Sequence, residues 1–573
     1  MSANHIDGGG VAAAATAPLP LTEGEPDTLP DLLDRSSRRF ADRPALEFLG
    51  RVWTYRAVGA LTDRLAQGLV RLGVGRGVQV GLCLPNTPYS VFFYFAILKA
   101  GGTVVNFNPL YTPRECLTQI RDSGTTLMVV SDVARIYDPV SAIADEAGLH
   151  HLILCPLADM LPFRRGVLYR LFKRTEIARI PADARHVPWT KLLTRGGGSD
   201  ARTAIRPDDI ALLQYTGGTT GTPKAAMLTH ANLAGNVRQL APLIRQTGLR
   251  DGQERVLAVI PLFHVFAMTA AMNLAIEIGA QIILVPQFKI DQLLATIART
   301  RPTFFPAVPT IFGAINKAAE TTPVDLGSIR LCISGGAPLP AEVASRFEAL
   351  TGCRLSEGYG LTESSPVVCV NPFDARRRPG SVGLPLAETT IEIRDPSHPD
   401  RLMPPGAKGE VYIRGPQVMA GYWRRPKDTA EVLVDGALRT GDVGYCDADG
   451  FLFLVDRIKD LIICGGYNVY PRQIEDALYE HEAVEEAVAV GIPDAYRGES
   501  PKAFVKLRAG HTATPETLRI FLADRLSKIE LPREIEIRTS LPKTAVGKLS
   551  KKELVAEERD RADLTSPNRR ASA

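Results

Sequence analysis

A run of small residues between two apolar segments constrains this chain more than any other feature. Residues 217–222 are three glycines and three threonines, and Pro223 and Lys224 follow directly. Glycine lets the backbone approach a ligand closely, so neighbouring backbone N–H groups and hydroxyls can point at one anion. The apolar residues 210–214 predict a buried strand before the run, and Thr229 is a suitable cap for a helix after it. A flexible linker is the alternative interpretation, but the apolar flanks and the lysine favour a loop that holds a polyphosphate.

The run matches neither of the two common nucleotide-binding motifs. In a Walker A motif, glycine precedes the lysine and serine or threonine follows it, whereas here Pro223 precedes Lys224 and Ala225 follows it. No G-x-G-x-x-G sequence lies at the end of the preceding strand, so the dinucleotide-binding fingerprint is absent as well. If the loop binds ATP, it does so by a different scheme.

Composition excludes several classes of protein. The chain has 573 residues, of which 45% are hydrophobic and 23% are charged, as in an ordinary globular protein of about three to four domains. Its formal net charge of +4 is too small to indicate a nucleic-acid partner. Eight cysteines without a C-x-x-C pair indicate reduced thiols in a cytoplasmic protein and no zinc site. No apolar run approaches the ~18 residues of a membrane-spanning helix.

Strand-like and helix-like patterns alternate along much of the chain. Residues 79–86 predict a buried strand, residues 89–99 an apolar helix and residues 101–109 a second buried strand. Such alternation is typical of parallel sheets covered by helices. Beyond residue 391 the strands become shorter, and beyond residue 456 a stretch rich in lysine and glutamate begins.

These changes predict an α/β fold in which a large N-terminal domain of α/β subdomains carries a small β subdomain and is followed by an α+β C-terminal domain. The expected divisions are a disordered tail at 1–28, the N-terminal domain at 29–457, the C-terminal domain at 458–558 and a second disordered tail at 559–573.

Residues 163–174 differ from their surroundings. They contain five basic residues and no acidic one, with Val167, Leu168, Leu171 and Phe172 on one helical face. A basic amphipathic helix of this kind can lie on an anionic membrane surface. The alternative is a solvated helix that packs on its own domain.

Three further groups of residues, far from the loop in sequence, suit the rest of one nucleotide. Small residues at 335–337 follow a predicted strand and let a flat base lie close to the backbone. Residues 359–363 supply an aromatic ring, a hydroxyl and a carboxylate that can bind Mg²⁺. Asp442 can accept hydrogen bonds from two ribose hydroxyls through its two oxygens. Each group alone also fits an ordinary turn, a core tyrosine or a hairpin aspartate.

Together and in this order, these segments resemble the acyl-adenylate-forming superfamily of acyl-CoA synthetases, adenylation domains and beetle luciferases. The resemblance covers the chain from about residue 30 to 555, and its motifs are YTGGTTGTPKAAMLTH, EGYGLTE, RTGD, VDRIKDLIICGGYNVYP and LPKTAVGKLSKKEL. Within the superfamily, EGYGLTESSPVVCVNPFD and GPQVMAGYWRRP are most similar to the bacterial long-chain fatty acid–CoA ligases.

The resemblance implies ATP-dependent activation of a long-chain fatty acid. Attack of the fatty carboxylate on the α-phosphate of ATP gives acyl-AMP and pyrophosphate, and the thiol of coenzyme A (CoA) then displaces AMP. The implied co-substrates are ATP and CoA, and the implied metal is Mg²⁺. Because both steps build negative charge, they need cations and preorganised hydrogen-bond donors.

The resemblance also assigns roles to residues. The expected catalytic residues are Lys548, which reaches the acyl carboxylate and the α-phosphate, together with Thr362, Glu363 and His264; Lys459 is the expected hinge of a mobile C-terminal domain. The expected ATP- and AMP-binding residues are Thr216, Gly217, Gly218, Thr219, Thr220, Gly221, Lys224, Gly335, Gly336, Ala337, Tyr359, Gly360, Asp442 and Arg457. The remaining expectations are Thr219 and Glu363 at Mg²⁺, Gly465 and Gly466 in a CoA tunnel, and Phe266, Met268, Phe305 and Val308 in an acyl pocket.

Several alternatives stay open on the sequence alone. A ligase for medium-chain or aromatic acids would share these motifs, and a non-catalytic AMP- or acyl-binding relative would keep the fold. The mark of such a relative would be loss of Lys548, Glu363 or Lys224, and all three are present. The expected location is the cytoplasm, with residues 163–174 as the contact if the protein associates peripherally with the inner membrane surface. A homodimer is a further alternative, because dimers occur in the superfamily.

Overall fold

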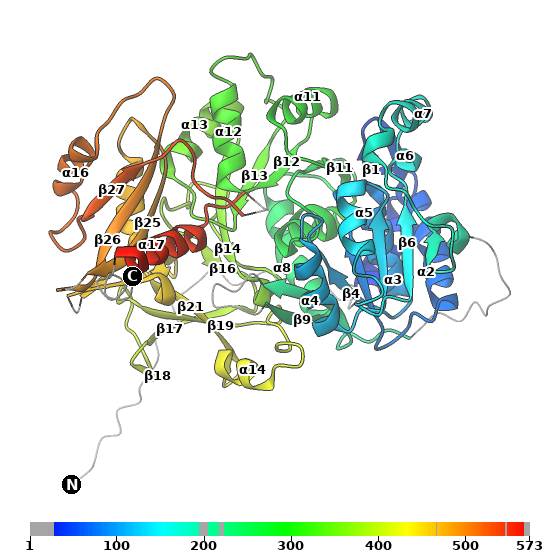
Figure 1. Cartoon of the computed structure of the whole chain (residues 1–573), viewed down its shortest axis with the longest axis horizontal. Helices are drawn as coiled ribbons and strands as arrows, with labels where there is room; N and C mark the ends of the chain where they lie inside the picture. The colour runs from blue at the N-terminus through cyan, green and yellow to red at the C-terminus, as the bar shows by residue number, and fades with distance from the viewer. Residues whose placement is uncertain are drawn as a thin grey trace, which may run out of the picture.

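The computed structural model describes residues 28–193, 204–216, 223–465, 467–494, 496–544 and 547–565. Two large sheets form the body of the N-terminal domain, a third sheet lies beside them, and a fourth belongs to the C-terminal domain (Figure 1). The predicted α/β fold with a small β subdomain and an α+β C-terminal domain is confirmed.

The first sheet presents the loop at residues 217–222. Its strands run in the order β7-β6-β5-β3-β4-β8-β9 and are parallel except for β9, which pairs antiparallel with β8. Parallel neighbours need long crossovers, and the predicted apolar helix, α3 (Pro88–Lys99), is one of them, with every residue from Pro88 to Leu98 buried. The strands are β3 (Gln79–Cys83), β4 (Thr103–Asn106), β5 (Leu127–Ser131), β6 (His151–Cys155), β7 (His186–Pro188), β8 (Ile210–Thr216) and β9 (Lys224–Thr229).

The second sheet has the order β16-β15-β14-β13-β12-β10-β11-β1-β2 and a parallel centre. Helices α12 (Pro309–Ala318) and α13 (Ala341–Thr351) connect its parallel strands β12, β13 and β14. The strands are β1 (Pro44–Phe48), β2 (Arg51–Thr54), β10 (Arg255–Ala258), β11 (Gln281–Leu284), β12 (Phe304–Ala307), β13 (Leu331–Gly335), β14 (Arg354–Gly360), β15 (Val367–Val370) and β16 (Leu384–Pro385).

The third sheet is antiparallel and forms the small β subdomain. Its strands are β17 (Thr390–Asp395), β18 (His398–Leu402), β19 (Gly409–Arg414), β20 (Leu433–Val434), β21 (Ala437–Cys446) and β22 (Leu452–Arg457).

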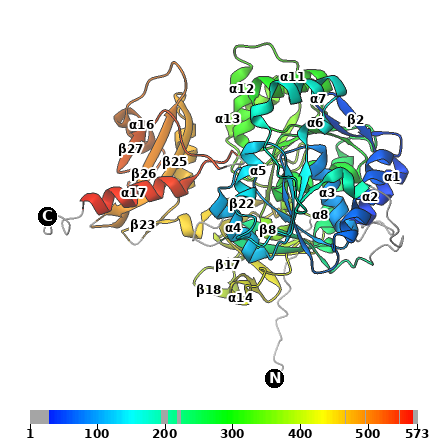
Figure 2. The same cartoon turned by 45° about the vertical axis from the view of Figure 1, so that its right-hand side comes forward.

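The fourth sheet and its helices form a separate body beside the N-terminal domain, as Figure 2 shows. A short 3-10 helix, Ile458–Asp460, follows β22 and leads into it. Its elements are β23 (Ile462–Cys464), β24 (Tyr467–Val469), α15 (Pro471–Tyr479), β25 (Val484–Asp494), β26 (Gly498–Leu507), α16 (Pro515–Ala523), β27 (Glu534–Ile537) and α17 (Lys551–Thr565).

Other helices cover the sheets of the N-terminal domain. Thr229 caps α8 as the sequence predicts, since its Oγ1 accepts a hydrogen bond from Asn232 N at 3.1 Å. No helix among the described residues is long and apolar enough to cross a membrane. These helices are α1 (Leu29–Arg39), α2 (Tyr55–Arg71), α4 (Pro113–Ser123), α5 (Ala134–Ser141), α6 (Leu157–Met160), α7 (Phe163–Phe172), α8 (His230–Gln246), α9 (Val265–Ala267), α10 (Leu274–Glu277), α11 (Ile290–Thr300) and α14 (Pro426–Val432).

The predicted start of the second disordered tail at residue 559 is wrong, because α17 continues to Thr565. Arg561 explains part of this extension: its Nη1 lies 2.9 Å from Glu536 Oε2 and 2.9 Å from Glu558 Oε1, which ties the last turns to β27. Residues 1–27 and 566–573, where the rest of the two tails was predicted, lie outside the described residues.

Candidate active site

The β8–β9 hairpin fixes both ends of the glycine- and threonine-rich loop. Thr216 pairs with Lys224 across the two strands, and Thr216 Oγ1 donates a hydrogen bond to Lys224 O at 3.4 Å. The predicted phosphate-binding residues between them (Gly217, Gly218, Thr219, Thr220 and Gly221) lie outside the described residues. The hairpin therefore delivers Lys224 to the base of the loop.

Lys224 and Glu363 meet around one tyrosine. The Lys224 ammonium pairs with Asp428 and lies 5.5 Å from the centre of the Tyr422 ring. Tyr422 Oη in turn donates a hydrogen bond to Glu363 Oε1 at 2.7 Å. Burial and the Glu363 carboxylate raise the pKa of Tyr422, so its hydroxyl stays a donor. Tyr422 and Asp428 were not predicted; the only sequence signal was that Tyr422 lies within the GPQVMAGYWRRP motif.

Glu363 offers a carboxylate rather than a complete metal site. It lies half-buried in the 3-10 helix Thr362–Ser364, and its Oε1 accepts the hydrogen bond from Tyr422. Among the described residues, no group of three or more His, Cys, Asp and Glu side chains could hold a metal ion. Mg²⁺ is usually bound by one or two carboxylates together with substrate phosphates, and Glu363 fits that arrangement.

The residues that are predicted to lie beside the adenine base are at the carboxyl ends of two neighbouring strands. Strands β13 and β14 pair in parallel, with Gly335 opposite Gly358, so residues 335–337 and 359–360 meet at one edge of the second sheet. A side chain at Gly360 would place its Cβ 1.8 Å from Pro366 O, so only glycine fits there. The sequence prediction that small residues permit close approach at this edge agrees with this packing.

Tyr359, Asp442 and Arg457 form one hydrogen-bonded cluster. Tyr359 Oη donates to Asp442 Oδ2 at 2.6 Å, and Arg457 Nε lies 2.8 Å from Asp442 Oδ1. Asp442 and Arg457 are neighbours because β21 and β22 pair them directly. The Asp442 carboxylate is buried, with 4% of the residue exposed, and its charge raises the pKa of Arg457. A carboxylate oxygen has two lone pairs, so each can accept from a second donor in addition to Tyr359 or Arg457.

The C-terminal domain inserts Lys548 into this site. A Cβ built on Gly336 would lie 2.7 Å from Lys548 Cε and 2.9 Å from Lys548 Nζ, and Gly336 has a φ of +82°. The loop that carries the lysine is held by α12, since Thr310 Oγ1 donates a hydrogen bond to Gly547 O at 2.8 Å. Lys548 therefore reaches residues more than 200 positions earlier in the chain because the two domains are docked in this way.

Burial and the neighbouring charges tune two of the predicted catalytic residues. Burial, followed by the positive charge of Arg457, lowers the pKa of Lys548 to about 8. Burial, followed by the charge of Lys548, lowers the pKa of His264 to about 3, so its imidazole is neutral at pH 7. His264 Nδ1 accepts a hydrogen bond from Phe266 N at 3.3 Å. The site thus combines a protonatable amine with a neutral imidazole.

Of the predicted hinge and CoA-tunnel residues, Lys459 lies near the charges of this cluster and Gly465 lies away from them. Lys459 lies in the 3-10 helix that joins the domains, where burial and then the charge of Arg457 lower its pKa. Gly465 lies between β23 and β24, and its N–H donates a hydrogen bond to Arg497 O within the C-terminal domain. Gly466 lies outside the described residues. In this domain arrangement Gly465 is not part of the nucleotide-side cluster.

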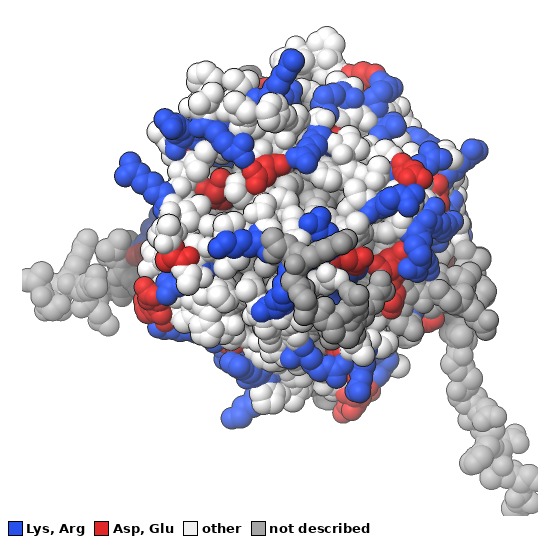
Figure 3. Space-filling model, turned by 90° about the vertical axis from the view of Figure 1, so that its right-hand side faces the viewer, with Lys and Arg blue, Asp and Glu red and all other residues white. Residues whose placement is uncertain are grey.

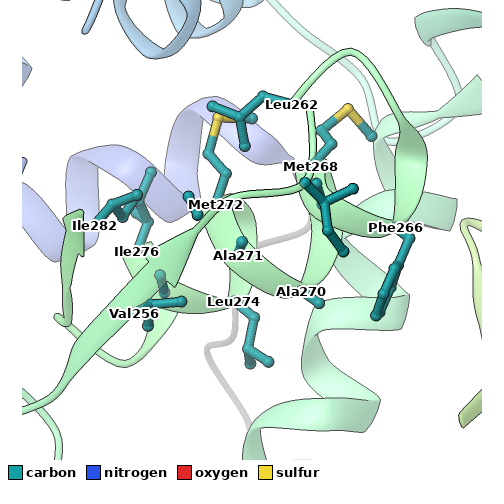
Figure 4. Packing of buried hydrophobic residues seen from close by; sticks show 14 of the residues in the cluster. Val256, Leu262, Phe266, Met268, Ala270, Ala271, Met272, Leu274, Ile276 and Ile282 are labelled. Carbon is teal, nitrogen blue, oxygen red and sulfur yellow. The ribbon is translucent and has the colours of Figure 1, made fainter. Parts of the chain in front are cut away.

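The predicted acyl-pocket residues are buried together around an unusual helical turn. Phe266, Met268, Phe305 and Val308 are all at most 7% exposed, and Met268 begins the π-helical segment Met268–Asn273 (Figure 4). A π-helical turn inside a helix is frequent at functional sites. The neighbouring cavity measures about 10 Å³, which is room for about one water molecule. Its lining is Leu82, Leu84, Ser90, Tyr94, Asn106, Leu262, Phe263 and Met272, and none of these was predicted.

Comparison with known proteins identifies the family. The family described as AMP-binding enzyme matches residues 33–423, and its C-terminal domain matches residues 473–548. The chain belongs to the AMP-binding enzyme family. This AMP-binding enzyme is 41% identical to a long-chain-fatty-acid–CoA ligase of Bacillus subtilis over 93% of the chain and 94% of the relative. It is 38% identical to a long-chain-fatty-acid–CoA ligase of Escherichia coli over 95% of the chain and 97% of that relative.

Solved structures show the same fold. ATP-bound MatB from Rhodopseudomonas palustris superposes on this AMP-binding enzyme with a TM-score of 0.80 at 29% sequence identity. The match covers 94% of this chain and 100% of MatB. It therefore includes both domains.

Proposed function

We propose that this AMP-binding enzyme is a long-chain fatty acid–CoA ligase that forms an acyl-AMP intermediate and releases AMP and pyrophosphate. The observation that carries the proposal is the docking of Lys548 against Gly336, beside the Tyr359–Asp442–Arg457 cluster. This arrangement brings a cation from the C-terminal domain to the Tyr359–Asp442–Arg457 cluster of the N-terminal domain. The names of the Bacillus and Escherichia relatives support the choice of a long-chain fatty acid as substrate.

In the first half-reaction the chain's residues hold ATP and neutralise charge. Lys224 and the loop at 216–222 bind the β- and γ-phosphates, while Thr362 donates its hydroxyl to the α-phosphate. Glu363 would hold Mg²⁺, which would neutralise negative charge that develops on the phosphates. Lys548 offers its ammonium to the acyl carboxylate and the α-phosphate as the acyl–phosphate bond forms.

Ribose and adenine are held by the edge of the second sheet. Asp442 accepts hydrogen bonds from the two ribose hydroxyls, while Tyr359 and Arg457 hold the carboxylate in place. Gly335, Gly336, Ala337 and Gly360 leave space for the flat base. His264, which is neutral, lies on the acyl side and adds no charge that would trap the carboxylate.

In the second half-reaction the thiol of CoA attacks the acyl carbon and AMP leaves. Lys548 fills the space beside Gly336, so we propose that the C-terminal domain rotates about Lys459 and withdraws it. In the rotated state Gly465 and Gly466 line the path of the pantetheine arm. One site can then run two reactions in sequence.

The acyl chain enters the buried region around the π-helical segment. The cavity there is too small for an acyl chain, so side chains must move to admit one. Met268 and Met272 are suited to this, because methionine is unbranched and adapts to irregular spaces. The apolar lining favours an uncharged acyl tail over a second carboxylate.

Measurement of AMP release tests the proposed function. With ATP, Mg²⁺ and CoA, we expect AMP and pyrophosphate to appear with palmitate or oleate, and the catalytic efficiency to be at least about tenfold lower with octanoate or an aryl acid. The alternative substrates, medium-chain and aromatic acids, are compared in the same series. If an aryl acid is preferred, the proposed substrate changes from a fatty acid to an aryl acid. If no acid gives AMP, both the fatty acid–CoA ligase and the aryl acid–CoA ligase proposals are wrong.

Peripheral membrane contact through α7 is part of the same proposal. Phe163, Leu168, Leu171 and Phe172 are 86%, 50%, 59% and 78% exposed, an unusual density of exposed large apolar side chains for one short helix. Basic side chains surround them at 164, 165, 170, 173 and 174. Figure 3 turns this side of the molecule to the viewer, and over its upper part more Lys and Arg surface than Asp and Glu surface is visible among uncharged residues. The resemblance to the superfamily is the support for a cytoplasmic location and for a homodimer.

One side of α7 packs against the N-terminal domain, and its exposed apolar side chains can contact a bilayer. A Cβ at Gly166 would lie 2.7 Å from Ala158 O, so the helix packs closely on α6. Arg165 Nη1 donates to Leu49 O at 2.7 Å, and Arg170 pairs with Asp159 at 2.5 Å. Apolar side chains with basic neighbours suit an anionic bilayer.

Vesicle sedimentation tests this contact. Replacing Arg164 and Arg174 by glutamine should weaken binding to vesicles of mixed phosphatidylserine and phosphatidylcholine about 10- to 30-fold, since each charge contributes about 1 kcal/mol near an anionic surface. Arg519→Gln with Lys528→Gln, two exposed basic residues of the C-terminal domain, is the matched control. Equal loss in both variants, or no loss in either, would argue against α7.

A further inference from the structure

Two ion pairs cross from the C-terminal domain to neighbouring helices of the N-terminal domain. Lys317 Nζ, near the end of α12, lies 3.2 Å from both carboxylate oxygens of Glu485 on β25. Arg508 Nη2, directly after β26, lies 2.6 Å from Glu342 Oε2 on α13. Figures 1 and 2 both show α12 and α13 on the side of the N-terminal domain that faces β25. The pairs therefore bridge the domains at one edge of their interface.

The same edge also holds the loop that carries Lys548. Glu486, next to Glu485 on β25, accepts a hydrogen bond from Lys543 Nζ at 2.6 Å, and Lys543 begins this loop. At the other end of α12, Thr310 holds Gly547. Helix α12 thus contacts the Lys548 loop directly through Thr310 and is joined to the strand that supports it through Lys317.

The four charged side chains of these two ion pairs belong to the domain interface and are not among the proposed catalytic or nucleotide-binding residues. Lys317 and Glu342 have side chains that are 53% and 52% exposed, at the rim of the interface. Lys506 Nζ also lies 2.8 Å from Glu485 Oε1 and helps to fix that carboxylate. Any effect of these pairs on the reaction must pass through the docking of the C-terminal domain.

We propose that Lys317–Glu485 and Glu342–Arg508 are an interdomain electrostatic latch that positions Lys548 for adenylation. The inference rests on the proposed function. The latch stabilises the docked arrangement, which serves acyl-AMP formation, relative to the rotated one, which serves thioester formation. Lys317, Glu342, Glu485 and Arg508 are positioning residues in this scheme.

The ratio of the two half-reaction rates measures the latch. If the domains exchange quickly, each rate follows the population of its own arrangement, so the ratio follows the equilibrium constant between them. Exposed ion pairs are each worth about 1.5- to 5-fold in such a constant. Removing both pairs should therefore lower the ratio of adenylation to thioester formation about 2- to 25-fold. Because exposed pairs are screened by salt, high ionic strength should lower the wild-type ratio toward that of the variant.

The experiment compares Lys317→Gln/Glu342→Gln with a control pair from the same region, Glu320 just after α12 and Arg346 on α13. Glu320 and Arg346 form an ion pair at 2.5 Å within the N-terminal domain, so Glu320→Gln/Arg346→Gln removes equal charge without touching the latch. Adenylation is followed as palmitate-dependent ATP–pyrophosphate exchange, and thioester formation as conversion of supplied palmitoyl-AMP with CoA. We expect the ratio of adenylation to thioester formation to fall in the latch variant and not in the control. The single variant Glu342→Arg should also lower this ratio, and the charge-reversed double variant Glu342→Arg/Arg508→Glu should restore it.

The possible failures are distinguishable. A wild-type chain without exchange would contradict the proposed function itself. A wild type that exchanges, with a latch variant that keeps the wild-type ratio at low salt, would overturn the latch alone. A latch variant that loses both half-reactions equally would also overturn it, because that result indicates general damage to the fold.

Discussion

Replacing Lys548 with alanine is expected to reduce fatty-acid-dependent ATP–pyrophosphate exchange by about 10²- to 10³-fold, the usual effect of removing one preorganised donor from a developing charge. Lys548 is the residue that the C-terminal domain inserts beside Gly336. Its pKa, lowered to about 8, leaves it mostly protonated at pH 7 in the absence of ligands. Bound carboxylate and phosphate would favour the ammonium further.

The second half-reaction separates this role from a structural one. Thioester formation from supplied acyl-AMP and CoA should stay within about threefold of the wild-type rate in Lys548→Ala, because the lysine is withdrawn in the rotated arrangement. Lys552→Ala, an exposed lysine in α17, is the matched control and should change neither rate. Exchange that survives in Lys548→Ala would show that another group neutralises the transition state.

The residues that we propose bind the nucleotide could be predicted from the sequence because they occur in short contiguous runs. Tyr359 and Glu363 lie within four positions of each other, and the parallel pairing of β13 and β14 places residues 335–337 beside them. Asp442 was predicted from one short motif, and β21–β22 pairing places it against Arg457. In these cases local sequence fixes both the chemistry and the turn that presents it.

Contacts between distant elements were not accessible in the same way. The sequence predicted a loop between a strand and a helix, but Lys224–Thr229 form a further strand, β9, which makes a hairpin with β8. Burial along β9 does not alternate, so these small residues carry only a weak strand signal. Tyr422 and Asp428 meet Lys224 only through tertiary packing, and Lys317 meets Glu485 only through domain docking. The cavity beside Met272 depends on side chains from five segments that share no sequence motif.

Asp442 gives the second large expected effect. Asp442→Ala should weaken AMP binding about 10²-fold, because it removes charge-assisted hydrogen bonds to two ribose hydroxyls, each worth about 1.5–3 kcal/mol. Asp442→Asn keeps the size of the side chain and should weaken binding about tenfold. Tyr359 and Arg457 hold the carboxylate at 2.6 Å and 2.8 Å, so its orientation is set before the ligand arrives.

A comparison of AMP with its 2′-deoxy analogue tests whether Asp442 contacts the ribose directly, and it separates that contact from an effect of the substitution on folding. Calorimetric titration of wild type with AMP and with 2′-deoxy-AMP should show a penalty for the missing hydroxyl. That penalty should disappear in Asp442→Ala, which removes the acceptor, and should become smaller in Asp442→Asn, whose amide oxygen still accepts a hydrogen bond. Asp449→Asn, an exposed carboxylate of the same subdomain that pairs with Arg378, should keep both affinities. If Asp442→Ala binds AMP more weakly but retains the full 2′-deoxy penalty, the carboxylate acts only by holding Arg457 and Tyr359, and the ribose is recognised by another group.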